Sequence, residues 1–159
     1  MTSQLKAIQF CVNGKTVHIS EDEASISLLN YLRESLGLTR VRYGCGAGAC
    51  GACTVVCNGE AVTSCDKILS DLNNADIETP EHLGSAEKTH PIFAALIEHQ
   101  AVQCGYCISG IAMRVKALLD KEPQPSKQTL DSALDHHLCR CGTHVRIKQA
   151  LYDLIEIKA

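Results

Sequence analysis

The sequence predicts an α+β protein, because its first half has the pattern of strands and its second half that of helices. Two Asn-Gly pairs, at 13–14 and 58–59, separate short runs with strand character, a strong signal for tight hairpins. The second half instead repeats apolar residues at helical spacing. A chain of 159 residues can bury a substantial core, in one compact domain or two small ones.

In chain order, the first half predicts a hairpin over 7–20, a helix over 27–36 and a second hairpin over 54–65. The helix carries leucines at helical spacing and stops at Gly37, a favourable residue just past a helix end. From about Asn73 to Pro91 the periodicity fades among prolines and a glycine, which predicts a linker. We therefore expect one domain over 1–78 and a second over 79–159.

The second half predicts four short helices packed as a small bundle. A helix is expected after Ser126, a preferred N-cap residue. Three apolar stripes mark the others: Ile92, Phe93, Leu96 and Ile97; Ile108, Ile111, Ala112, Val115 and Leu118; and Ile147, Ala150, Leu151 and Leu154.

Charge and composition exclude several classes of function. Fifteen Lys and Arg against 18 Asp and Glu give a net charge of -3 without a basic run, so nucleic acid is not an expected partner. No window predicts a membrane-spanning helix or a signal peptide, so we expect a cytoplasmic chain, exported to the periplasm only together with a partner. No nucleophile with a base, phosphate loop or nucleotide fingerprint is recognisable, so no substrate site is expected on this chain.

The ten cysteines are the most unusual feature of the composition. Disulfides are one explanation. The C-x2-C spacings and the lack of an export signal favour metal ligation in a reducing compartment instead.

The predicted second hairpin selects a first set of cysteines by geometry. If Asn58-Gly59 is a two-residue turn, Cys57 pairs with Glu60, and counting back brings Cys65 beside Cys53. Cys57 then lies four residues farther along the strand, about 13 Å away, too far to share a small metal site. We expect Cys57, like Cys11, to pack as an inert apolar side chain. The working set is Cys45, Cys50, Cys53 and Cys65.

The spacing of this set is C-x4-C-x2-C followed by a fourth cysteine after eleven residues, which is the plant-type pattern for a 2Fe-2S cluster. Glycines between the cysteines let the backbone curl around a compact anionic cluster and bring N–H groups near its sulfurs. These glycines are Gly44, Gly46, Gly48 and Gly51.

A second set combines a C-x2-C with a C-x-C, each just before an apolar helical stripe, so both pairs should lie near helix N-termini that favour thiolates. Its members are Cys104, Cys107, Cys139 and Cys141. Four cysteines can also bind zinc, but the C-x-C pair and the first set favour a second iron–sulfur cluster. We expect the neighbouring histidines, His136, His137 and His144, to cap or solvate helix ends rather than to bind metal.

Three motifs, "GCGAGACGACTVVCNG", "QCGYCISG" and "CRCGTHVRI", in this order and spacing resemble the small iron–sulfur subunit of the molybdenum hydroxylases, the xanthine oxidase and aldehyde oxidoreductase superfamily. The resemblance covers nearly the whole chain. It implies a β-grasp domain of plant-ferredoxin type over 1–78 and a four-helix bundle domain over 79–159, each with one 2Fe-2S cluster.

The resemblance also implies a large partner subunit that holds a molybdopterin cofactor, as the cytosine dinucleotide. Gln103 would touch the pterin, and Cys141 would be the ligand nearest to it. Electrons from the partner's hydroxylation of a substrate would pass singly through the second set to the first.

The "CRCGTH" form resembles the branch that includes the small subunits of isoquinoline oxidoreductase and aerobic nicotinate dehydrogenase. This implies an N-heteroaromatic substrate hydroxylated with oxygen from water. In this branch the acceptor is often a cytochrome domain or another carrier without a flavin subunit, so a cytochrome c is expected, with an FAD-containing subunit as the alternative. The alternatives are an aldehyde-oxidising enzyme, a stand-alone redox carrier or sensor, and a structural module held by zinc or disulfides.

Overall fold

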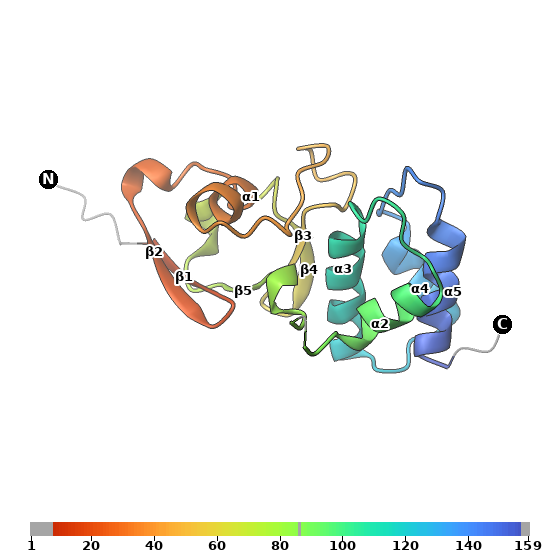
Figure 1. Cartoon of the computed structure of the whole chain (residues 1–159). Helices are drawn as coiled ribbons and strands as arrows, with labels where there is room; N and C mark the ends of the chain where they lie inside the picture. The colour runs from red at the N-terminus through yellow and green to blue at the C-terminus, as the bar shows by residue number, and fades with distance from the viewer. Residues whose placement is uncertain (1–7, 86, 157–159) are drawn as a thin grey trace, which may run out of the picture.

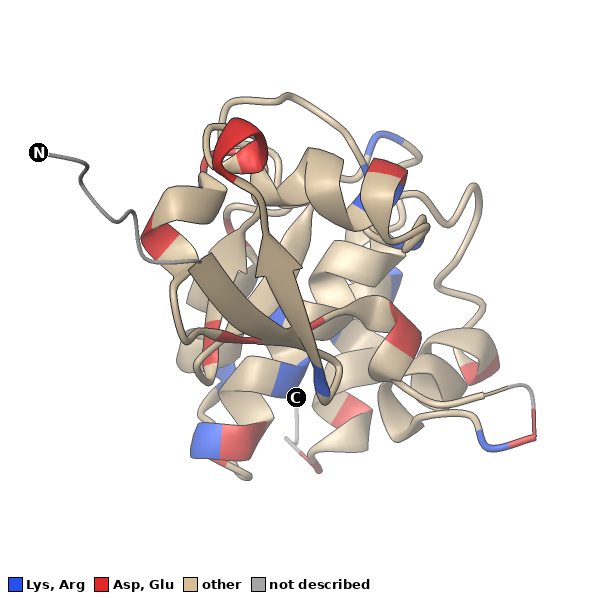
Figure 2. Ribbon diagram, turned by 90° about the vertical axis from the view of Figure 1, so that its left-hand side faces the viewer, with Lys and Arg blue, Asp and Glu red and all other residues tan. Residues whose placement is uncertain are grey.

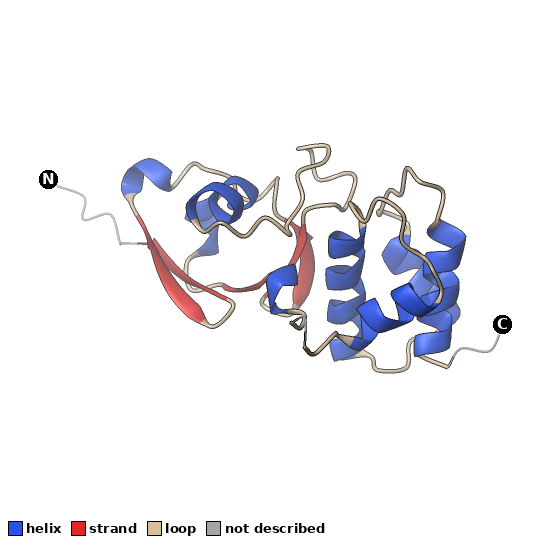
Figure 3. Ribbon diagram, in the orientation of Figure 1, coloured by secondary structure: helices blue, strands red, loops and turns tan. Residues whose placement is uncertain are grey.

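The structure is a computed structural model that describes residues 8–85 and 87–156 (Figure 1). Five strands form one mixed sheet, and four helices in the second half gather beyond one end of it (Figure 3). The predicted α+β class is confirmed. Within the described residues, every helix is too short or too polar to cross a bilayer.

Both predicted hairpins are present. Strands β1 (Ile8–Val12) and β2 (Lys15–Ile19) are antiparallel, as are β3 (Thr54–Cys57) and β4 (Glu60–Thr63), and Cys57 pairs with Glu60 as expected. In the first turn Asn13 and Gly14 have φ values of 51° and 79°. Two consecutive positive φ angles define the turn that matches the twist of a hairpin, and Asn and Gly tolerate them best.

The prediction of a linker from Asn73 to Pro91 is wrong in one respect, because this segment contains strand β5 (Asp76–Glu78). The sheet order is β2-β1-β5-β3-β4, so this three-residue strand is the central one, parallel to β1 and antiparallel to β3. A strand this short shows no periodicity, and its position depends on side chains from both hairpin turns. Asn58 Oδ1 accepts a hydrogen bond from Asp76 N (2.7 Å), and Asn13 Oδ1 accepts one from Thr79 N (2.9 Å).

The predicted helix of the first half consists of α1 (Leu28–Asn30) followed by the π-helical turn η2 (Tyr31–Ser35). Its leucines join Phe10 and Ile77 in the first hydrophobic core. Short 3-10 turns complete this half: η1 (Glu21–Glu23), η3 (Leu69–Leu72) and η4 (Pro80–His82).

The four helices of the second half are α2 (Pro91–Glu98), α3 (Ile108–Lys121), α4 (Lys127–Leu134) and α5 (His144–Leu154). Ser126 caps α4 as expected, since its hydroxyl accepts a hydrogen bond from Thr129 N (3.1 Å). The stripes form the second hydrophobic core, with one error: Ile97 is 67% exposed. Leu96 points inward where α2 packs on α5, and Ile97 lies off that contact.

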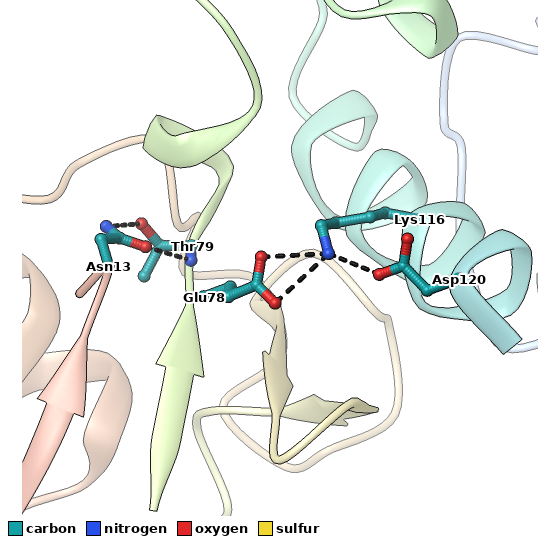
Figure 4. Close-up of polar contacts among 5 residues, drawn as sticks. All are labelled: Asn13, Glu78, Thr79, Lys116 and Asp120. Atoms are coloured by element: carbon teal, nitrogen blue, oxygen red, sulfur yellow. Dashed lines mark hydrogen bonds and ion pairs between the residues drawn. The ribbon is translucent and has the colours of Figure 1, made fainter.

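The two halves share an interface. Helix α3 packs against β3 and β4, and Val56 of β3 belongs to the second core. Figure 4 shows Lys116 of α3 between Glu78, at 3.0 Å, and Asp120, at 2.5 Å. Charges of both signs are scattered over the rest of the ribbon (Figure 2), in keeping with the lack of a basic run. The ion pair between Lys116 and Glu78 thus links helix α3 to the central strand β5.

Replacing Lys116 by methionine should lower the free energy of unfolding by about 1 kcal/mol, because the side chain is only 15% exposed and the lost pair with Glu78 is partly desolvated. Lys67→Met is a matched control. Its pair with Asp66 is 42% exposed on both sides, so no change is expected. Urea unfolding followed by circular dichroism measures both variants, and equal stabilities would contradict the role given to Lys116.

Candidate metal centres

The first cysteine set lies on the loop before β3 and on the residues just after β4. Cys53 precedes β3 and is 1% exposed, Cys45 is exposed, and Cys50 and Cys65 are half-buried. The hairpin brings its two ends together, because Ser64 N and Ser64 Oγ both donate to Cys53 O, at 3.2 and 2.8 Å. The β3–β4 pairing thus sets Cys65 beside Cys53, as the counting predicted.

Backbone N–H groups of the loop point at the sulfurs of this set. Ala47 N and Ala49 N lie 3.3 and 3.2 Å from Cys45 Sγ. Cys65 Sγ accepts from Gly48 N (3.2 Å), and Cys50 Sγ from the N–H of Cys45 (3.3 Å). Donors of this kind stabilise thiolates and the sulfurs of an anionic cluster.

Hydrogen bonds from these donors favour the thiolate form of a cysteine. The N–H groups of Ala47 and Ala49 lower the pKa of Cys45 to about 6. Burial raises the pKa of Cys65 to about 11, and the adjacent Cys53 thiol adds to the rise. Metal binding would supply the positive charge that a half-buried thiolate such as Cys65 needs.

The loop also shows a cradle that a side chain would fill. A Cβ on Gly44 would lie 2.5 Å from Cys50 Sγ, so only glycine lets the backbone pass this close to the sulfur. Four thiols, inward N–H donors and this close approach fit a compact anionic iron–sulfur cluster.

The second set lies at two helix starts, as expected. Cys107 immediately precedes α3, and Cys139 and Cys141 precede α5. The four thiols lie near enough to influence one another: Cys141 helps to lower the pKa of Cys104, and Cys139 helps to raise that of Cys107. Burial, and then the neighbouring Cys139, raise the pKa of Cys107 to about 12.

Two pairs of cysteines, Cys104 with Cys107 and Cys139 with Cys141, match the chemistry of a two-iron cluster, in which each iron takes two cysteine ligands. A structural zinc site instead gathers all four sulfurs around one ion. Among the described residues no three Cys, His, Asp or Glu side chains surround a single metal position. All ten cysteines are free thiols.

The remaining candidates occupy two different environments. Gln103 is exposed, next to the exposed Cys104, and Cys141 is half-buried. Cys11 and Cys57 lie on strands β1 and β3, and burial raises the pKa of Cys57. A buried thiol with a raised pKa stays protonated and unreactive.

The expectation that His137 caps or solvates a helix end is wrong. His137 is 3% exposed, and burial followed by the Arg114 charge lowers its pKa to about 4. Its Nε2 lies 3.2 Å from Thr54 Oγ1, across 83 residues of sequence. Such a tertiary contact has no local sequence signal.

Two other contacts near the cysteine sets were also not anticipated. Thr143 Oγ1 lies 3.2 Å from Cys139 Sγ, and Leu138 N donates to Cys50 O at 3.1 Å. The second contact joins the residue next to Cys139 directly to a cysteine of the first set. A C-x-C motif alone gives no sign of either contact.

Two family models match the chain. Residues 10–84 match a 2Fe-2S iron–sulfur cluster binding domain, and residues 79–152 match a second 2Fe-2S binding domain. The chain therefore contains two 2Fe-2S binding domains.

Similar proteins are subunits of oxidoreductases. The chain is 46% identical to a nicotinate dehydrogenase subunit of Pseudomonas putida, over 91% of both chains. It is 45% identical to the alpha subunit of isoquinoline 1-oxidoreductase from Brevundimonas diminuta, over 91% of this chain and 95% of that one. The branch expected from "CRCGTH" is confirmed.

Solved structures agree. Quinoline 2-oxidoreductase from Pseudomonas putida 86 superposes with a TM-score of 0.85 at 32% identity, over 97% of this chain and 96% of that chain. Aldehyde oxidoreductase from Desulfovibrio gigas superposes with a TM-score of 0.88 at 32% identity, over 96% of this chain but 17% of the other. With its two matched domains and these relatives, the chain belongs to the iron–sulfur electron-transfer subunits of the molybdenum hydroxylases, which work beside a large molybdopterin-binding subunit.

Proposed function

We propose that the chain carries single electrons from its large partner to an external acceptor, through two 2Fe-2S clusters held by eight cysteines. Cys45, Cys50, Cys53 and Cys65 bind one cluster, and Cys104, Cys107, Cys139 and Cys141 bind the other. When bound, each cluster supplies a centre that takes up and returns one electron. The protein holds the thiolates, directs N–H donors at them and keeps the two sets close.

The observation that carries this proposal is the hydrogen bond from Leu138 N to Cys50 O. Leu138 precedes Cys139 in the chain, so a route with a single hydrogen bond and otherwise only covalent bonds connects Sγ of Cys139 with Sγ of Cys50. A route this short suits transfer of electrons between the sets.

The second set is proposed to face the partner, with electrons entering there. Cys104 and Gln103 are exposed, and so are the apolar side chains of Val102 and Tyr106, which neighbour them in the sequence, and of Val145, which follows Cys141. Exposed apolar side chains near a redox site are typical of an interface. In this proposal Gln103 touches the partner's pterin and Cys141 is the ligand nearest to it.

Finer features of the fold follow the same proposal. Residues 1–78 form a β-grasp domain of plant-ferredoxin type and residues 79–159 a four-helix bundle domain. The end of β5 at Glu78 and the start of the second family match at residue 79 support this boundary.

For the substrate, we propose an N-heteroaromatic compound that the partner hydroxylates with oxygen from water. Support comes from the relatives named for nicotinate, isoquinoline and quinoline. The chain is 46% and 45% identical to the nicotinate and isoquinoline subunits, but 36% identical to the iron–sulfur-binding subunit of the Escherichia coli aldehyde oxidoreductase. A cytochrome c or an FAD-containing subunit would accept the electrons.

Low-temperature EPR of the anaerobically purified, dithionite-reduced chain tests the cluster assignment. Two distinct spin-half signals of similar integrated intensity are expected. A silent spectrum from a protein that contains zinc would contradict the proposal, and a single signal would limit the chain to one cluster.

A further inference from the structure

The two cysteine sets are separated by a contact between two glycines. Gly110 lies in the first turn of α3, three residues after Cys107, and Gly51 follows Cys50. A Cβ on Gly110 would lie 2.1 Å from Gly51 O and 3.1 Å from Ala52 O. The backbone of α3 therefore rests directly on the backbone of the first loop, with no room for a methyl group.

Gly51 is held on its other side by the His137 ring. A Cβ on Gly51 would lie 2.6 Å from His137 Cδ2. His137 in turn is tied to the start of α5, because His144 Nε2 lies 2.9 Å from His137 O. Gly51 is thus enclosed between α3 and the segment that leads to Cys139.

Thr54 completes the arrangement with its hydroxyl. Thr54 Oγ1 donates to Gly51 O at 2.7 Å, so its lone pairs remain to accept from His137 Nε2 at 3.2 Å. A neutral ring with its proton on Nε2 satisfies this contact. The other ring nitrogen, Nδ1, is buried with no hydrogen-bond partner among the described residues. The single hydroxyl fixes both the carbonyl of Gly51 and the orientation of the ring.

All four residues, Gly51, Thr54, Gly110 and His137, are buried, and Thr54 has no exposed surface. We call them the glycine joint. A close-packed contact is stiff, because each atom can move only if its neighbours move too. The joint is also the place where a bulkier residue would push the two sets apart.

We propose that the glycine joint is a spacer that fixes the separation of the two cysteine sets and so sets the rate of electron transfer between them. The inference rests on the function proposed above. In the step concerned, the cluster at the second set loses one electron and the cluster at the first set gains it, with no bond made or broken. Gly110 and Thr54 are positioning residues, because neither of them binds a cluster.

The test compares the holoprotein with its Gly110→Ala and Thr54→Val variants. The methyl group of alanine should push α3 away from Gly51, and valine keeps the volume of threonine but removes both hydrogen bonds of the hydroxyl. We expect both EPR signals to keep their intensity in each variant. The spin–spin splitting between the two reduced clusters should be reduced or lost, because it falls steeply with distance, and electron transfer between them after rapid partial reduction should slow.

Two controls separate position from mere disturbance. Thr54→Ser keeps the hydroxyl and should restore the splitting of the wild type. Ser109→Ala alters a half-exposed residue beside Gly110 and should leave the splitting unchanged.

The outcomes distinguish the two proposals. A wild-type chain without two signals overturns the proposed function. Two normal signals whose splitting is the same in wild type, Thr54→Val and Gly110→Ala overturn the glycine joint. If Gly110→Ala does not fold, Thr54→Val decides, because valine occupies the same volume as threonine and introduces no steric clash.

Discussion

Cys53→Ser should abolish the EPR signal and the iron of the first cysteine set, while the signal of the second set persists. Cys53 is 1% exposed, and Cys65 lies beside it at the base of the β3–β4 hairpin. A serine hydroxyl is a poor replacement for a thiolate, because its oxygen stays protonated and binds iron weakly in place of sulfur. Iron analysis together with spin integration measures the loss.

Cys57→Ser is the matched control, since this cysteine lies only four residues farther along the same segment. It packs against the first core, and burial raises the pKa of its thiol. Both signals and the full iron content should remain. Loss of the first signal in Cys57→Ser, or its survival in Cys53→Ser, would show that the hairpin geometry selects the wrong cysteines.

Features encoded within a few residues could be predicted from the sequence. An Asn-Gly pair specifies its own turn, and the turn then determines which residues of the two strands face each other. The pairing of Cys57 with Glu60 could therefore be predicted by counting residues outward from the turn. The same local logic placed Cys107 at the start of α3 and Ser126 at the cap of α4. Ligand spacings are local as well, which is why the cysteine sets could be listed without a structure.

Features that depend on partners far along the chain could not be predicted. Strand β5 has three residues and no pattern of its own, and its place in the sheet comes from β1 and β3. His137 stands next to an exposed histidine in the sequence, yet it is buried against Thr54. Ile97 fits the apolar stripe of α2 and is nevertheless exposed, because only the packing partners decide which edge of a stripe is covered.

Asn13→Ala should lower the free energy of unfolding by about 2–5 kcal/mol. Asn13 is held at a φ of 51°, where alanine is strained by about 1–2 kcal/mol. Its amide also donates to Thr79 Oγ1 (2.8 Å) and accepts from Thr79 N (2.9 Å), and each lost hydrogen bond costs about 0.5–1.5 kcal/mol. Figure 4 shows this pair at the end of the central strand. Urea unfolding of anaerobically prepared protein measures the loss.

Asn13→Gly separates the two causes, because glycine accepts the positive φ but has no amide. It should cost about 1–3 kcal/mol, the part that belongs to the two hydrogen bonds. Asn74→Gly is the control: Asn74 has a φ of 60°, and its side chain makes no hydrogen bond within the described residues, so no loss of stability is expected. If Asn13→Gly were as stable as the wild type, the asparagine would serve the turn alone and β5 would be held by its backbone ladder. If Asn13→Gly lowers the free energy of unfolding and Asn74→Gly does not, the side chain of Asn13 anchors strand β5. The same strand carries Glu78, which pairs with Lys116 of helix α3.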